Sequence, residues 1–193
     1  MQRNNKLRML IYCAMFAAIT GILAQVEIPL PLVPISGQTL AVGLTATIIG
    51  SRYGAIAMIV YACLGAVGVP VFAEAKAGLH ILVGPTGGYI FSFIISAFIT
   101  GLILEKTKFT ILNAMIANTI GMIITLTLGT IQLKYVADLS WTTAIGAGVT
   151  PFIVVGLIKA YLASVIGIKV RERLLKADLL TDVSRDSEKT IAA

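Results

Sequence analysis

Lys159 is the residue of this sequence whose surroundings most need a chemical explanation. It lies near the middle of an apolar stretch, residues 150–170, whose only other charge, Lys169, is at the end. On a helix, Lys159 stands about 13 Å from either end of that stretch, too far for easy snorkelling to the headgroups. A bare ammonium in hydrocarbon costs about 2.5 kcal/mol or more. We therefore predict that Lys159 faces a polar cavity and holds an anion or an acidic partner; the alternative is a lysine tilted up to the interface.

A second candidate region is the proline-containing segment of residues 26–39. Its three prolines stiffen an extended backbone, and such a strip can lie across the mouth of a pocket. Val33 would cover a ligand, while Gln38 and Thr39 would offer an amide and a hydroxyl to its polar atoms. The alternative is an ordinary rigid connector between helices.

A third candidate is the glycine-rich segment Gly84-Pro85-Thr86-Gly87-Gly88-Tyr89, where an irregular loop enters an apolar stretch. Glycines allow close approach to the backbone, and the free amides of a helix N-terminus suit a carbonyl or carboxylate oxygen. Tyr89 would add a flat wall. The alternative is that the glycines serve helix packing.

Asn118 lies deep in another apolar stretch, where an amide needs partners. It either bonds a neighbouring helix or lines the cavity. Ala14 and Ala18 form a smooth face on the first apolar stretch, which permits close approach of a helix from this chain or from another membrane subunit.

Composition defines the elements that must position these residues. The chain has 193 residues, is 58% hydrophobic and 12% charged, and has a mean hydropathy of +0.95. These values exclude an ordinary soluble domain and predict an all-α membrane protein of about six spans. The expected transmembrane helices cover residues 7–25, 37–51, 53–69, 86–104, 109–130 and 149–170.

Charge distribution predicts the orientation. Apart from Lys76, Lys134 and Lys159, all of the 15 basic residues fall on one side of the expected spans. The positive-inside rule then places both termini in the cytoplasm. We expect a transmembrane substrate-binding domain over residues 1–171 and a charged cytoplasmic tail over residues 172–193.

The sequence lacks the motifs that are typical of several classes of protein function. The sequence has no Gly-rich loop ending in Gly-Lys-Ser/Thr, no His-Glu-x-x-His and no paired intramembrane carboxylates. Its cysteines have no histidine or acidic cluster at metal-ligand spacing, and no basic patch is interleaved with aromatics as nucleic-acid binding requires. We therefore expect no enzyme, cofactor, metal or nucleic acid, and a partner that supplies the energy for any uphill transport across the bilayer.

Four segments are specific in combination: PISGQT at residues 34–39, YACLGAVGVPVF at residues 61–72, GPTGGY at residues 84–89, and Pro151-Phe152 with Lys159. Together they closely resemble the BioY family, the biotin-binding S-components of energy-coupling factor (ECF) transporters. The resemblance extends over about residues 7–170.

The resemblance implies a six-helix bundle in a bacterial or archaeal plasma membrane, with a biotin pocket near its outer surface. It also implies assembly with a transmembrane coupling protein and two cytoplasmic ATPases, with Ala14 and Ala18 docking on the coupling protein. Biotin chemistry then assigns the candidates: Gln38, Thr86 and Asn118 to the ureido edge, Val33, Phe72 and Tyr89 to the apolar walls, and Lys159 to the carboxylate.

One position departs from the expected family pattern. Three residues before the lysine, where we expect an acid that would pair with it, this chain has Gly156. Lys159 is then freer to bind a ligand carboxylate. Two alternative functions stay open: an S-component for another carboxylated vitamin, and an intramembrane enzyme that uses Lys159 as a base or Schiff-base amine.

Overall fold

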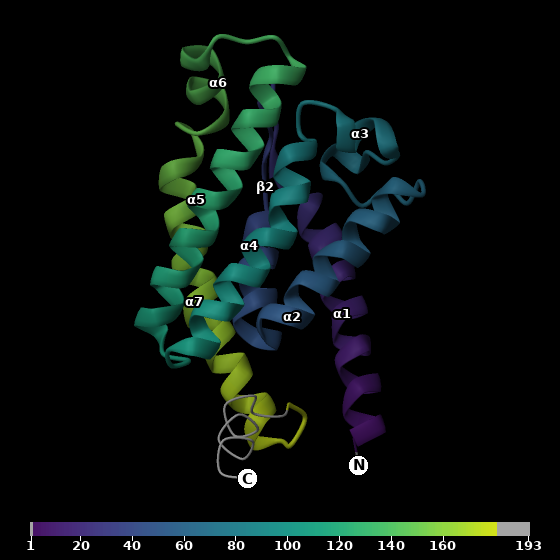
Figure 1. Cartoon of the computed structure of the whole chain (residues 1–193), viewed down its shortest axis with the longest axis vertical. Coiled ribbons are helices and arrows are strands. Elements are labelled where there is room, and N and C mark those ends of the chain that lie inside the picture. The colour runs from purple at the N-terminus through teal and green to yellow at the C-terminus, as the bar shows by residue number, and fades with distance from the viewer. Residues whose placement is uncertain (1, 181–193) are drawn as a thin grey trace.

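The computed structural model describes residues 2–180, which form a bundle of long helices with short loop elements at one end (Figure 1). In chain order the elements are α1 (Gln2–Ala24), β1 (Glu27–Ile28), β2 (Ile35–Ser36), α2 (Gln38–Ala66), η1 (Ala73–Ala75), α3 (Leu79–Val83), α4 (Gly87–Lys106), α5 (Ile111–Val136), α6 (Trp141–Gly148) and α7 (Phe152–Lys176). Within the described residues, five helical stretches are long and apolar enough to cross a membrane: α1, α2, α4, α5 and α6 continued by α7. The expected all-α membrane fold is confirmed.

The α2 helix turns back on itself at Gly50, which separates a first arm, residues 38–49, from a second arm, residues 51–66. Gly50 has a φ of +81°, a value that glycine adopts without the strain other residues would suffer. On one straight helix Gln38 and Tyr61 would stand about 34 Å apart, yet their side chains are hydrogen-bonded. The arms therefore lie side by side, and counting them separately accounts for all of the expected spans.

The position of this turn differs from the prediction. The expected helices over residues 37–51 and 53–69 put the connection near residue 52, but the break lies at Gly50 and Ser51 already begins the second arm. The Glu105 carboxylate of α4 accepts hydrogen bonds from the Ser51 backbone N–H at 2.7 Å and from its hydroxyl at 2.6 Å, and so caps the new helix start. Gly101 lets α4 lie directly against Ser51, because a Cβ there would overlap the Ser51 backbone.

The end of the first arm is closed by a buried arginine of α7. Arg171 is 2% exposed, donates to the Ile48 carbonyl at 2.6 Å and places its guanidinium 3.6 Å from the centre of the Phe109 ring. A cation is favourable at a helix C-terminus, where carbonyls lack intrahelical donors. Arg171 thereby joins α7 to the turn of α2.

Hydroxyl groups and glycines hold α4 against α5. Ser96 donates to the Gly121 carbonyl at 3.0 Å, and Thr100 donates to the Ala117 carbonyl at 3.2 Å. Gly129 of α5 lies against the Tyr89 ring, which a Cβ at Gly129 would overlap. Small residues and interhelical hydrogen bonds are the usual means of association in lipid, because apolar burial gives little driving force there.

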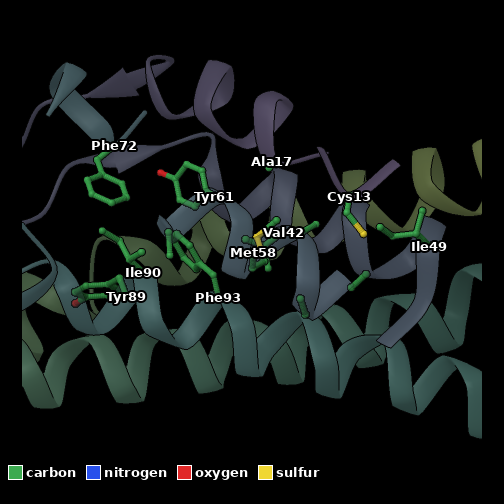
Figure 2. Packing of buried hydrophobic residues seen from close by; sticks show 14 of the residues in the cluster. Cys13, Ala17, Val42, Ile49, Met58, Tyr61, Phe72, Tyr89, Ile90 and Phe93 are labelled. Carbon is green, nitrogen blue, oxygen red and sulfur yellow. The ribbon is translucent and has the colours of Figure 1, made fainter. Parts of the chain in front are cut away.

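Most of the buried apolar residues form one large cluster that runs along the bundle (Figure 2). The rings of Phe72, Tyr61, Tyr89 and Phe93 gather at one end of this cluster, and Cys13 lies toward the other. A smaller, second cluster consists of Leu104, Ala114, Ala117 and Ile168. Many large apolar side chains instead face outward, as expected for a lipid-facing surface; they include Ile22, Leu112, Val154 and Tyr161.

Short elements cover the end of the bundle that carries these aromatic rings (Figure 1). The β1–β2 hairpin pairs Glu27 with Ser36 in antiparallel register. In η1, Glu74 and Ala75 have φ values of 59° and 52°, which are strained for residues with side chains. Their N–H groups bond to Glu27 and Gln25, so the loop after α1 holds η1 in place. The sequence did not predict the hairpin, η1, α3 or α6.

The start of α1 and the end of α7 lie at the opposite end of the bundle, side by side: Arg8 donates to the Asp178 carbonyl at 2.7 Å (Figure 1). Because both lie at the same end of the bundle, the chain between them must cross the membrane an even number of times. The α7 helix runs without a break through residue 171 to Lys176, so it extends into the first residues of the segment expected as the tail. The rest of the predicted tail, residues 181–193, lies outside the described residues.

Candidate ligand-binding site

The Lys159 amine lies inside the protein, as the sequence predicted. Its Nζ donates to the Ser36 carbonyl at 2.6 Å and to the Thr39 hydroxyl at 3.3 Å. Lys159 projects from α7, whereas Ser36 ends the β1–β2 hairpin and Thr39 begins α2. An ammonium carries three donors, so within the described residues one donor is left for a ligand oxygen.

Two cavities meet at Lys159. The loop cavity, about 820 Å³ including its open mouth, lies beneath the hairpin and η1. The inner cavity, about 580 Å³ by the same measure, lies between α2, α4, α5 and α7. Besides Lys159, the loop cavity is lined by six of the residues selected from sequence: Val33, Gln38, Thr39, Phe72, Thr86 and Tyr89.

Aromatic rings form the apolar walls of the loop cavity. Phe72 is 1% exposed and packs edge-on to Tyr61 with 5.6 Å between ring centres. Tyr89 donates its hydroxyl to the Gly148 carbonyl at 2.9 Å, so its polar group is engaged with the protein. The ring of Tyr89 lies 6.4 Å from that of Phe152. Phe72, Tyr89 and Phe152 line the loop cavity, and Figure 2 shows Phe72 and Tyr89 at the same end of the apolar cluster.

Gln38 is 7% exposed and is held at both ends of its amide. Its Oε1 accepts from the Ser36 hydroxyl at 2.6 Å, and its Nε2 donates to the Tyr61 hydroxyl. Tyr61 in turn donates to the Val71 carbonyl at 3.0 Å. The predicted polar residue of the pocket is thus part of a hydrogen-bonded chain.

Asn118 lines the inner cavity and not the loop cavity. The two N–H groups of its Nδ2 are shared among three acceptors: the Thr47 hydroxyl at 3.1 Å, the Ala114 carbonyl at 2.9 Å and the Ser164 hydroxyl at 3.2 Å. These contacts connect α5 with α2 and α7. Asn118 therefore both bonds neighbouring helices and lines a cavity, so each of the two alternatives stated for it is present in the structure.

Gly84, Pro85 and Gly87 line neither of the two cavities. The Gln132 amide donates to the Leu82 carbonyl at 2.9 Å and to the Gly84 carbonyl at 2.8 Å. A Cβ at Gly87 would overlap the Leu82 carbonyl and lie 2.6 Å from the Gln132 nitrogen. In this loop the glycines allow close packing on α5, which is the alternative stated for them, and the loop presents Thr86 to the cavity.

Gly156 lies in the inner cavity beside Met122. A Cβ at this position would overlap the Met122 sulfur. The thioether therefore occupies the space that the expected acidic side chain would need, and the Lys159 amine bonds to Ser36 and Thr39 instead.

Ala14 and Ala18 are exposed on α1, whereas Ala17 and Gly21 on the same helix are buried. The inward face of α1 packs on Val71, which lies 3.1 Å from a Cβ built at Gly21. The small residues Ala14 and Ala18 are thus left on the outward surface, away from the bundle.

Two residues of the site were missed from the sequence. Tyr61 is fully buried and bonds Gln38, and Gln132 anchors the loop that carries Thr86. A signal for both existed, because a hydroxyl or amide within an apolar stretch requires a hydrogen-bond partner. Their partners depend on the turn at Gly50 and on the α4–α5 packing, which the sequence pattern does not specify.

These features define a class: a multi-pass membrane protein whose helices enclose a ligand cavity under a loop cover. The sequence profile of the BioY family matches residues 1–176. The chain belongs to the BioY family.

Named relatives agree with this assignment. The chain is 37% identical over 166 residues to the biotin transporter BioY2 of Lactococcus lactis subsp. cremoris, covering 86% of this chain and 91% of that protein. It is 40% identical over 167 residues to the biotin transporter BioY of Thermotoga maritima, covering 86% and 97%. These relatives are named as transporters, not enzymes.

A solved structure shares the fold. The crystal structure of the S-component for biotin from an ECF-type ABC transporter superposes with a TM-score of 0.83 at 28% sequence identity. The match covers 89% of this chain and 95% of that chain. The bundle is therefore that of an ECF S-component, a membrane transport subunit.

Proposed function

We propose that this protein is the high-affinity biotin-binding subunit of an ECF-type vitamin uptake transporter. The observation that carries the proposal is the Lys159 amine, which lies where the loop cavity meets the inner cavity and has a donor left for an anion. Membership of the BioY family and relatives named as biotin transporters support biotin as that ligand.

The cavity matches the chemistry of biotin. The ligand carboxylate pairs with Lys159, and the sulfur ring packs against Val33, Phe72 and Tyr89. Gln38 and Thr86 offer hydrogen bonds to the ureido group. A mostly apolar cavity with a few fixed polar groups is the usual form of a tight small-molecule site.

Import requires partners in this proposal. A transmembrane coupling protein docks on the exposed face of α1 at Ala14 and Ala18, and two cytoplasmic ATPases supply the work. Both termini lie in the cytoplasm in this proposal, which the basic residues near the start of α1 and the end of α7 support by the positive-inside rule. The loop cavity then opens on the outer side of the plasma membrane, where the vitamin arrives.

Calorimetry of the purified protein in detergent, without ATP, tests the proposal. We expect saturable binding of one biotin per chain, and lipoate, which has a carboxylate but no ureido ring, should compete poorly. Folded protein that gave no saturable biotin signal would reject the proposal. Equal affinity for lipoate would instead indicate a site that recognises only the carboxylate of its ligand.

A further inference from the structure

Tyr61 connects the two arms of α2 immediately behind the loop cavity. It is 0% exposed and lines neither of the two cavities, so it does not touch a ligand there. Its hydroxyl bonds to Gln38, which does line the loop cavity, and to the Val71 carbonyl at 3.0 Å. Tyr61 therefore acts on binding only through its neighbours: its hydroxyl bonds to Gln38 and its ring packs on Phe72. Removal of the hydroxyl alone changes the first contact and keeps the second.

The proton positions in the hydrogen-bonded series that links Val71, Tyr61, Gln38 and Ser36 follow from which atoms can donate. A carbonyl can only accept, so the single Tyr61 proton goes to Val71. The Tyr61 oxygen must then accept from Gln38, which places the NH₂ end of that amide toward Tyr61. The other end, Oε1, faces the Ser36 hydroxyl at 2.6 Å.

The reversed amide would put the Gln38 oxygen against a Tyr61 oxygen that has no proton to give. In a buried site, an unsatisfied acceptor of this kind disfavours the reversed amide by a factor of about 5 to 150. Phe72 stacks edge-on against Tyr61 at 5.6 Å and is itself 1% exposed. The two rings therefore bury the hydrogen bond between Tyr61 and Gln38. The Gln38 amide has one preferred orientation, with its NH₂ group toward Tyr61.

A fixed amide has a defined recognition pattern. After its bonds to Tyr61 and Ser36, Gln38 keeps one N–H donor and one lone pair on Oε1. A donor and an acceptor side by side complement a ligand edge that has a carbonyl next to a ring N–H, as in a cyclic urea. A freely rotating amide would also accept ligands that carry only donors.

We propose that Tyr61 is a positioning residue that fixes the direction of the Gln38 amide and so makes the site selective for the carbonyl and N–H of a cyclic urea. This inference rests on the proposed biotin function and deepens it. It assigns two parts of the ligand to different residues: Lys159 binds the carboxylate, and Gln38, oriented by Tyr61, recognises the ureido ring.

The test compares biotin with 2-iminobiotin, in which a cationic imino group replaces the ureido carbonyl and leaves only donors. Affinities of both ligands are measured by calorimetry for the wild type and for Tyr61→Phe. We expect Tyr61→Phe to weaken biotin binding about tenfold, the effect of one buried hydrogen bond. The preference for biotin over 2-iminobiotin should also fall about tenfold, because the amide can now turn its oxygen toward the ligand.

The matched control is Tyr12→Phe. Tyr12 also donates its hydroxyl to a backbone carbonyl, that of Leu179, but lines neither of the two cavities. This variant should leave both affinities and their ratio unchanged. An equal loss for biotin and 2-iminobiotin in folded Tyr61→Phe would overturn the inference, because it would show that Tyr61 only supports the fold.

Gln38→Glu gives a second test that retains Tyr61. A carboxylate offers only acceptors, so this variant should bind 2-iminobiotin more tightly than biotin; a preference for biotin as strong as that of the wild type would contradict the inference. Failure of the wild type to bind biotin would reject the proposed function itself. Binding by the wild type with unchanged selectivity in both variants would reject the roles of Tyr61 and Gln38 and leave the biotin function in place.

Discussion

The Lys159 ammonium is bonded to the Ser36 carbonyl at 2.6 Å across 123 residues of sequence. This bond joins the middle of α7 to the end of the hairpin that covers the loop cavity. The hydrogen bonds to Ser36 and Thr39 offset part of the cost of holding a cation in an apolar bundle. A carboxylate would neutralise the charge, which an uncharged carbonyl and hydroxyl do not.

Lys159→Met should weaken biotin binding about 30- to 100-fold, because a charge-assisted hydrogen bond contributes roughly 2–3 kcal/mol. The fold should survive, since methionine fills a similar volume and removes a buried charge. Titration calorimetry and thermal unfolding measure the two quantities. Lys134→Met is the control, because Lys134 lies over the rings of Tyr135 and Trp141 and lines neither cavity. Unchanged biotin affinity in Lys159→Met would contradict the assignment of Lys159 to the ligand carboxylate.

Bulky residues at the outward face of α1 should separate binding from transport. The double variant Ala14→Leu/Ala18→Leu should bind biotin normally in detergent, because both side chains are exposed. Uptake by cells that also express the coupling module should fall, since a smooth face is needed for close helix docking.

The neighbouring residue Ala17 provides the control for this face. Ala17 is 0% exposed, so Ala17→Leu should overpack the bundle and lower the unfolding temperature. If the Ala14→Leu/Ala18→Leu variant lost biotin binding instead of uptake, its face would serve internal packing.

The wall residue Phe72 should be sensitive to Gly65→Ala. A Cβ at Gly65 would overlap the Phe72 ring, which would have to move toward the loop cavity. We expect a loss of about 1–3 kcal/mol in stability together with weaker biotin binding. Gly146→Ala is a matched control because a Cβ there meets nothing within 4 Å; equal behaviour of the two variants would show that the ring adjusts freely.

The turn of α2 should depend on Glu105. Glu105→Ala removes both acceptors of Ser51 and should destabilise the protein by about 1–3 kcal/mol. Glu105→Gln keeps one carbonyl acceptor and should retain part of that stability. Unfolding followed by circular dichroism in detergent measures the order wild type, Gln, Ala. Equal stability of all three would indicate that Gly50 alone determines the turn.

Much of the site was accessible from sequence, for reasons that particular residues illustrate. Lys159 was identifiable because hydrocarbon penalises a charge wherever the chain places it. The proline-containing segment was a candidate cover, beside the alternative of a rigid connector, because prolines restrict the backbone locally. Such local energetic rules require no knowledge of which helices are neighbours.

Pairings between distant residues were less accessible. The Gln38–Tyr61 bond exists only because Gly50 folds α2 back, and the spacing of apolar residues does not reveal that geometry. The amide of Gln132 bonds to the carbonyls of Leu82 and Gly84, and this pairing depends on how α4 packs on α5. The helix α6 was also missed, although Ser140 caps it through the Thr143 N–H at 3.2 Å, because its eight residues are too few for a clear hydropathy signal.

The central claim is that Lys159 binds the carboxylate of biotin, and the most direct test removes each of these two charges in turn. Biotin and biotinamide, which has an uncharged tail, are titrated into the wild type and into Lys159→Met. We expect the wild type to prefer biotin by about 30- to 100-fold and the variant to bind both ligands about equally. The same preference for biotin in both proteins would show that the carboxylate does not meet Lys159.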